Sequence, residues 1–168
     1  PMTKGAMQAM RAAEEFLGKR ARGQTGPLAD HGWIAAGASK RGWTTWTVGA
    51  VTCPTCVRVQ GIAPLVPIAP MIHADMHRQW RSYGGWTFAF APYLAVNLTT
   101  YLDDPRFATD MMAVVDPIAY LGPLARVPKL VVVSSDDEFM QFDWTGFWPS
   151  LGGEEHLLIV PNSEHSLI

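Results

Sequence analysis

The sequence has no excess of positive charge: 13 Lys and Arg residues stand against 15 Asp and Glu residues, a net charge of −2. Nucleic acids and anionic membrane surfaces are bound by basic patches, so neither is an expected partner. No run of about 18 apolar residues occurs, and no membrane-spanning segment is expected. The 168 residues, 48% hydrophobic and 17% charged, instead have the composition of one soluble globular domain.

Cysteine is scarce, and its two copies, Cys53 and Cys56, form a single C-x-x-C. A structural zinc site needs a second pair of ligands, so zinc is disfavoured, while a local disulfide and two free thiols both stay open. His73 and His77 lack an accompanying H-E-x-x-H carboxylate, so no metal site is expected. No cofactor is expected either. The chain starts at Pro1 without an apolar leader, and this start is uninformative about export.

Four short apolar runs alternate with helical patterns, which is typical of a parallel sheet. They predict strands at 33–37, 57–66, 129–133 and 156–160. Helices are predicted at 2–19, from apolar spacing of i, i+3, i+4 and i+7, and at 40–51. The aromatic-rich segment 71–126 is expected to hold several helices and part of a cap or substrate pocket. The predicted fold class is α/β, with a mostly parallel sheet and helices on both faces.

The hexapeptide 37–42 (GASKRG) lies where the first predicted strand turns into a helix. A nucleophile elbow needs this order, because its serine takes a strained backbone and small neighbours let helix and strand pass closely. Ser39 would project at the carboxyl end of the sheet, with the backbone N–H of Lys40 as one oxyanion donor. Arg41 replaces the usual second glycine of G-x-S-x-G, and a Gly/Ser turn that caps a helix fits the hexapeptide alone equally well.

An acid and a base follow the serine in the order Ser, Asp, His that this fold requires. Asp137 lies in the loop 134–143 after the third predicted strand, and His165 lies in the loop 161–168 after the fourth. A serine hydroxyl becomes a nucleophile when a histidine takes its proton and a carboxylate orients that histidine. Since all three candidates follow strands at one edge of the sheet, we predict that Ser39, Asp137 and His165 form a catalytic triad.

Three aromatic residues of the long segment, Trp80, Tyr83 and Trp86, are predicted to shape the substrate pocket. The alternative is that these rings belong to the hydrophobic core. The expected substrate is a small-molecule ester or a peptide, and the residues favour neither esterase nor peptidase activity.

Motifs spread over nearly the whole chain include 37–46 (GASKRGWTTW), 77–85 (HRQWRSYGG), 137–139 (DEF) and 160–167 (VPNSEHSL). Together they resemble the PhoPQ-activated pathogenicity-related family, which includes autocrine proliferation repressor-like proteins. The resemblance assigns the triad to Ser39, Asp137 and His165, with Asp137 rather than Asp136 as the acid. It also implies an α/β-hydrolase fold and a secreted or periplasmic protein. The elbow is similar to that of glucuronoyl esterases, whose basic residue after the serine, here Lys40, assists the oxyanion.

The resemblance also concerns domain organisation, because family members are considerably longer at the amino end. Residues 1–168 are therefore expected to be one α/β-hydrolase domain fragment, the C-terminal part of the complete domain. The usual source of the second oxyanion donor would lie outside it, and its exposed nucleophile strand would be an aggregation-prone edge. The leading hypothesis is a serine hydrolase acting by acyl transfer. The alternative is a secreted signalling or binding protein on the same scaffold.

Overall fold

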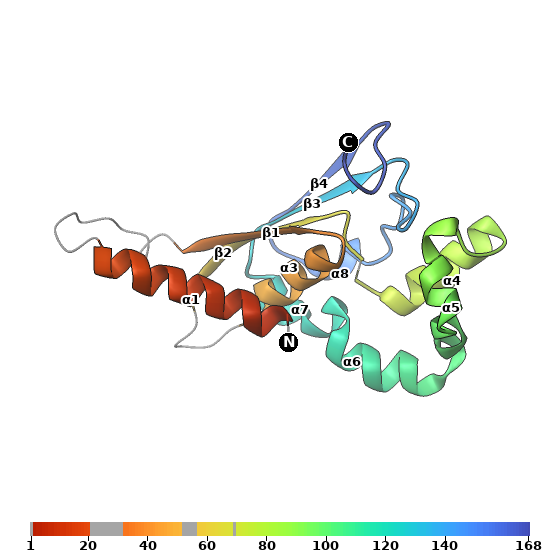
Figure 1. The fold of residues 1–168 in the computed structure, drawn as a ribbon, viewed down its shortest axis with the longest axis horizontal. Helices are drawn as coiled ribbons and strands as arrows, with labels where there is room; N and C mark the ends of the chain where they lie inside the picture. Colours follow the sequence, from red (N-terminus) through yellow and green to blue (C-terminus); the bar gives the residue numbers. More distant parts are fainter. Residues whose placement is uncertain (1, 21–31, 52–56, 69) are drawn as a thin grey trace.

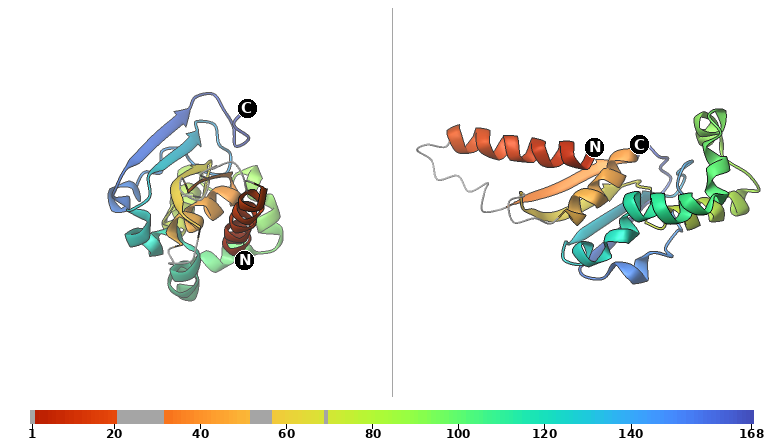
Figure 2. Two further views of the ribbon diagram at one scale, coloured as in Figure 1. Left: turned by 90° about the vertical axis from the view of Figure 1, so that its left-hand side faces the viewer. Right: turned by 90° about the horizontal axis from the view of Figure 1, so that it is seen from below.

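A computed structural model describes residues 2–20, 32–51, 57–68 and 70–168. The two alternatives for Cys53 and Cys56 lie outside these ranges. Four strands form one parallel sheet in chain order, and the sheet is twisted (Figures 1 and 2). They are β1 (Trp33–Ala38), β2 (Val59–Leu65), β3 (Lys129–Ser134) and β4 (Glu155–Val160). All four predicted strands are confirmed, with ends that differ by at most two residues.

The two predicted helices, 2–19 and 40–51, are confirmed, and the segment 71–126 holds several helices as expected. The longer ones are α1 (Met2–Arg20), α3 (Lys40–Ala50) and α4 (Ile72–Tyr83). The segment 71–126 holds further short elements: η1 (Phe88–Phe90), α5 (Ala91–Ala95), η2 (Leu98–Asp103), η3 (Phe107–Met111), α6 (Met112–Val115), η4 (Pro117–Tyr120) and α7 (Leu121–Leu124). A last helix, α8 (Trp148–Leu151), precedes β4. None of the described helices is both long and apolar enough to cross a bilayer.

The main core forms where α3, α7 and α8 pack on one face of the sheet. Trp46 of α3 is fully buried there, and its ring meets that of Phe147 edge to face, with centroids 6.4 Å apart. On the opposite face Ile34, Leu130 and Leu158 are exposed. The predicted α/β architecture is thus confirmed, and the helices of this core share one face rather than covering both.

A second, smaller core lies beyond the carboxyl end of the sheet, where α4, α5 and α6 are seen in both figures. It is centred on Ile72 and Met76 of α4. The buried carboxylate of Asp116 accepts hydrogen bonds from the backbone N–H groups of Met71 (3.0 Å), Ile72 (2.7 Å) and Ile118 (3.0 Å). These three bonds join the start of α4 to the turn after α6, so the helical segment stays at this end of the sheet.

Candidate active site

Ser39 lies at the sharp turn between β1 and α3. Its backbone has φ 54° and ψ −125°, a strained conformation for a residue with a side chain. Its N–H donates to the carbonyl of Leu65 on the neighbouring strand (2.9 Å), which holds the turn in place. A Cβ on Gly37 would come within 2.8 Å of the Arg41 carbonyl oxygen, and one on Gly42 within 2.9 Å of that of Leu65. Both glycines are therefore needed for the close passage of strand and helix that an elbow requires.

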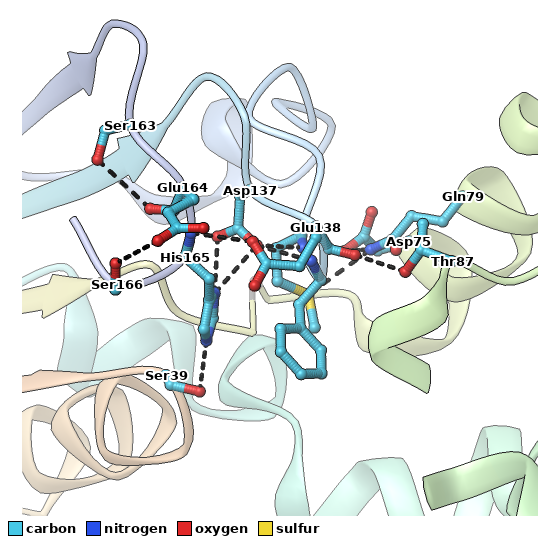
Figure 3. Close-up of polar contacts among 12 residues, drawn as sticks. Ser39, Asp75, Gln79, Thr87, Asp137, Glu138, Ser163, Glu164, His165 and Ser166 are labelled. Carbon is cyan, nitrogen blue, oxygen red and sulfur yellow. Dashed lines mark hydrogen bonds and ion pairs between the residues drawn. The ribbon is translucent and has the colours of Figure 1, made fainter. Parts of the chain in front are cut away.

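His165 lies between Ser39 and Asp137 (Figure 3). The Ser39 hydroxyl is 2.7 Å from Nε2 of His165, and Nδ1 of His165 is 2.9 Å from Oδ2 of Asp137. With a neutral imidazole, both hydrogen bonds of His165 form when its Nδ1–H donates to the Asp137 carboxylate and its Nε2 accepts a hydrogen bond from the Ser39 hydroxyl. The structure thus brings together three residues from loops that follow three different strands.

Asp137 is held in an acceptor role by its own loop. The backbone N–H groups of Phe139 and Met140 both donate to its Oδ1 at 2.8 Å, and its side chain is only 2% exposed. Asp136 is exposed, and its carboxylate accepts from the hydroxyl of Ser135 (3.1 Å). The two adjacent aspartates therefore have different surroundings, and it is Asp137 that contacts the imidazole.

The imidazole of His165 is set in an environment that favours its protonated form. The hydrogen bond to Asp137 raises the pKa of His165, partial burial opposes this, and the charges of Asp137 and Glu138 add to the increase. Glu138 also accepts a hydrogen bond from the backbone N–H of His165 (3.1 Å), and the ring of Phe139 packs 4.7 Å from the imidazole. Neither neighbour was assigned to the site from the sequence, although both directly follow Asp137.

The whole chain matches a known protein family. The PhoPQ-activated pathogenicity-related protein family matches the chain over residues 1–168. The chain belongs to this family. It is also 40% identical over 171 residues to autocrine proliferation repressor protein A of Dictyostelium discoideum. That match covers 100% of this chain and 32% of the relative, so the chain spans about a third of the relative's length.

Solved structures show the fold of this PhoPQ-related chain. Acylaminoacyl peptidase of Pyrococcus horikoshii superposes with a TM-score of 0.56 at 16% identity, over 91% of this chain and 22% of that one. Puromycin hydrolase gives a TM-score of 0.53 at 18% identity, over 79% of this chain and 18% of that one. The family and the α/β-hydrolase scaffold expected from the motifs are therefore confirmed.

Helix α4 supports the loop 134–143, named here the acid loop because it carries Asp137, from the side away from His165 (Figure 3). Asp75 is almost fully buried, and its Oδ2 accepts from Nε2 of Gln79 (3.1 Å). Its other oxygen has no partner among the described residues, and burial raises the pKa of Asp75 to about 7. Gln79 also contacts the sulfur of Met140 (3.6 Å), and Arg78 pairs with Asp143. This buried acid had no local signal in the sequence.

The remaining predicted site residues lie in different surroundings. Lys40 is the first residue of α3, where helix N–H groups lack intrahelical partners, so its backbone N–H is suited to bind an anion. Trp86 lines an apolar pocket that is also lined by Phe139, the ring that packs against His165. Trp80 is 49% exposed beside another cleft, which His77 also lines, and Tyr83 is 54% exposed. Of the three predicted aromatic residues, only Trp86 lines this apolar pocket.

His73 and His77 contact each other through Nε2 atoms 3.1 Å apart. Nε2 of His73 is also 2.8 Å from the carbonyl oxygen of Leu102. Across the described ranges, no group of three His, Cys, Asp or Glu residues is arranged to hold a metal ion. The two imidazoles therefore connect α4 to the neighbouring η2 turn.

Proposed function

We propose that the protein is a serine hydrolase that acts by acyl transfer on an ester or peptide bond. The observation that carries this proposal is the continuous chain of contacts from Ser39 Oγ through His165 to the buried Asp137. A hydroxyl 2.7 Å from an imidazole that is itself oriented by a carboxylate has the geometry of an activated nucleophile. The strained elbow and the family's hydrolase scaffold support the same role.

The proposed reaction follows from these contacts. Ser39 Oγ attacks the carbonyl carbon and passes its proton to Nε2 of His165, while the Lys40 N–H donates to the oxygen that becomes negative. His165 then gives the proton to the leaving alcohol or amine, which departs as the acyl-serine ester forms. Water, deprotonated by His165, attacks this ester; the bond to Ser39 Oγ breaks, His165 returns the proton to Ser39 Oγ, and the acid is released. Asp137 stabilises the imidazolium that forms in each of the two half-reactions.

The test is active-site labelling of the full-length protein with a fluorophosphonate probe, which phosphonylates activated serines. The wild-type protein should be labelled, and the Ser39→Ala variant should not. Ser166→Ala is the matched control, because Ser166 is an exposed serine next to His165 and should leave labelling intact. Labelling that persists in Ser39→Ala, or is absent from a folded wild-type protein, would refute the proposed nucleophile.

A second candidate is a secreted signalling protein that acts through its surface. The 40% identity to a protein named autocrine proliferation repressor favours this candidate. In a growth assay, full-length wild-type protein and Ser39→Ala would be added at equal concentration to cells of the source organism. Equal repression by both would show a role that is independent of the serine, whereas loss in the variant would tie repression to hydrolysis.

We also propose that the protein is secreted or periplasmic, which follows from the family resemblance. The test is fractionation of cells that express the full-length protein at its natural level. Recovery from the medium or periplasm is expected, and recovery only from the cytoplasm would refute the proposed location.

A further inference from the structure

We propose that the apolar pocket lined by Trp43 and Phe139, which contact Ser39 and His165, binds an uncharged, apolar group of the substrate, close to a phenyl ring or a medium-length alkyl chain in size. This inference rests on the proposed hydrolase function and concerns its substrate class. We name the pocket, lined in part by Trp43, Trp86, Phe139 and Met140, the apolar pocket.

Two residues that line the apolar pocket contact residues of the triad. Trp43 lies one helical turn after Ser39, and its backbone N–H donates to the Ser39 carbonyl oxygen (3.1 Å). Phe139 lines the pocket and packs its ring 4.7 Å from the ring of His165. A substrate whose carbonyl carbon reaches Ser39 therefore has this pocket as the neighbouring space for one of its substituents.

The chemistry of the lining selects against charge. No charged residue lines the pocket, and its few polar side-chain atoms include the indole N–H of Trp43, which donates to the Val115 carbonyl (2.7 Å). The lining is mainly aromatic and aliphatic, and four methionines contribute soft, adaptable surface: Met76, Met111, Met112 and Met140. A charged substituent would lose its hydration without gaining a partner, whereas an apolar one gains burial.

The volume of the apolar pocket sets the size of the group. The cavity measures about 200 Å³. For comparison, an engineered apolar cavity of about 150 Å³ stays dry and binds benzene. The apolar pocket therefore has room for a phenyl ring with a short linker, or for an alkyl chain of similar volume, and is too small for a long acyl chain in full.

The first experiment measures kcat/KM of the full-length protein for two ester series. One varies the acyl group from p-nitrophenyl acetate through butyrate and hexanoate to 3-phenylpropionate, and the other varies the alcohol of acetate esters from methyl to hexyl and benzyl. A rise of about tenfold or more along either series is expected, since a single methylene in an apolar pocket is worth that much, and the series that rises identifies the side of the ester that is bound. Flat profiles in both, with turnover that needs Ser39, would overturn this inference and leave the proposed function standing.

A matched pair of variants tests whether the preference arises in this pocket. Met111 and Val114 are both exposed apolar residues of the same helical stretch, 43% and 67% exposed, and Met111 lines the pocket whereas Val114 lies outside its lining. In the series that rises for the wild type, Met111→Glu should lower the ratio of turnover of the hexyl or hexanoate ester to that of the shortest ester at least tenfold, because it places a charge at the pocket. Val114→Glu should keep the wild-type ratio. Equal ratios in both variants would place the selectivity elsewhere.

A binding measurement separates this inference from the proposed function. The full-length Ser39→Ala protein, labelled with ¹³C at its methionine methyl groups, would be titrated with ethylbenzene. Signals of the four lining methionines should shift, while those of Met2, Met7 and Met10 on α1 should not. Shifts without any ester turnover by the wild-type protein would remove the proposed function but retain an apolar binding site. Unchanged signals from all four would overturn the apolar pocket itself.

Discussion

Replacing Asp75 by Asn should make the stability of the protein less dependent on pH. Burial raises the pKa of Asp75 from 3.8 to about 7, and this gap of about three pH units corresponds to about 4 kcal/mol. The folded protein keeps the proton up to about pH 7, whereas the unfolded chain loses it near 3.8. The free energy of unfolding therefore falls as the pH rises between these two values, and it stays low above them.

The Asp75→Asn variant keeps the shape of the side chain and an oxygen for Gln79, but it cannot ionise. Its stability relative to wild type should grow by about 3 kcal/mol between about pH 5 and about pH 8.5. At about pH 8.5 the free energy of unfolding of the variant should exceed that of the wild type by about 1–3 kcal/mol. The difference is smaller than the full cost of ionising Asp75, because the amide group introduced at this position is itself buried beside that of Gln79.

The assay is urea unfolding of the full-length protein, followed by tryptophan fluorescence and extrapolated to zero denaturant at each pH. Asp110→Asn is the control, because Asp110 is exposed and its substitution should change stability by no more than about 0.5 kcal/mol at any pH. Parallel curves for wild type and Asp75→Asn across the pH range would refute the reasoning that a buried, half-partnered carboxyl group lies beneath the acid loop.

Three further predictions concern the triad and its elbow. Asp137→Asn should lower kcat/KM for an ester by about 10⁴, whereas Asp136→Asn should keep most activity, and the reverse order would overturn the assignment. The proposed acyl transfer needs neutral His165, and the hydrogen bond to Asp137 raises the pKa of His165. We therefore expect kcat/KM to fall with decreasing pH around an apparent pKa above the ordinary value of 6.5; an apparent pKa at or below 6.5 would contradict this. Gly42→Ala should lower the unfolding free energy by about 1–3 kcal/mol, since its Cβ meets the Leu65 carbonyl, while Gly122→Ala, with open space around it, should not destabilise.

The sequence by itself was enough to identify the four strands, the helices 2–19 and 40–51, and their order. Short apolar runs predicted the strands and apolar residues at helical spacing predicted the helix 2–19, because these local patterns reflect which parts of an element are buried. The glycines of 37–42 also marked the elbow, because a strand and a helix that cross closely leave no room for a side chain at the crossing. Chain order and strand ends then placed Ser39, Asp137 and His165 at one edge of the sheet.

Only the tertiary structure decided what surrounds those residues. Ser39 and His165 are 126 positions apart, and the 2.7 Å between them depends on the paths of two loops that no periodic pattern describes. Burial decided that Asp75 is an acid with a raised pKa, since the same residue on an exposed helix face would be an ordinary carboxylate. The same cause separates Trp86 in the apolar pocket from the exposed Tyr83 three residues earlier. Packing across the molecule sets the direction of a side chain in the loop that follows a helix or strand. Whether a segment forms a helix or a strand is set mainly by its own residues.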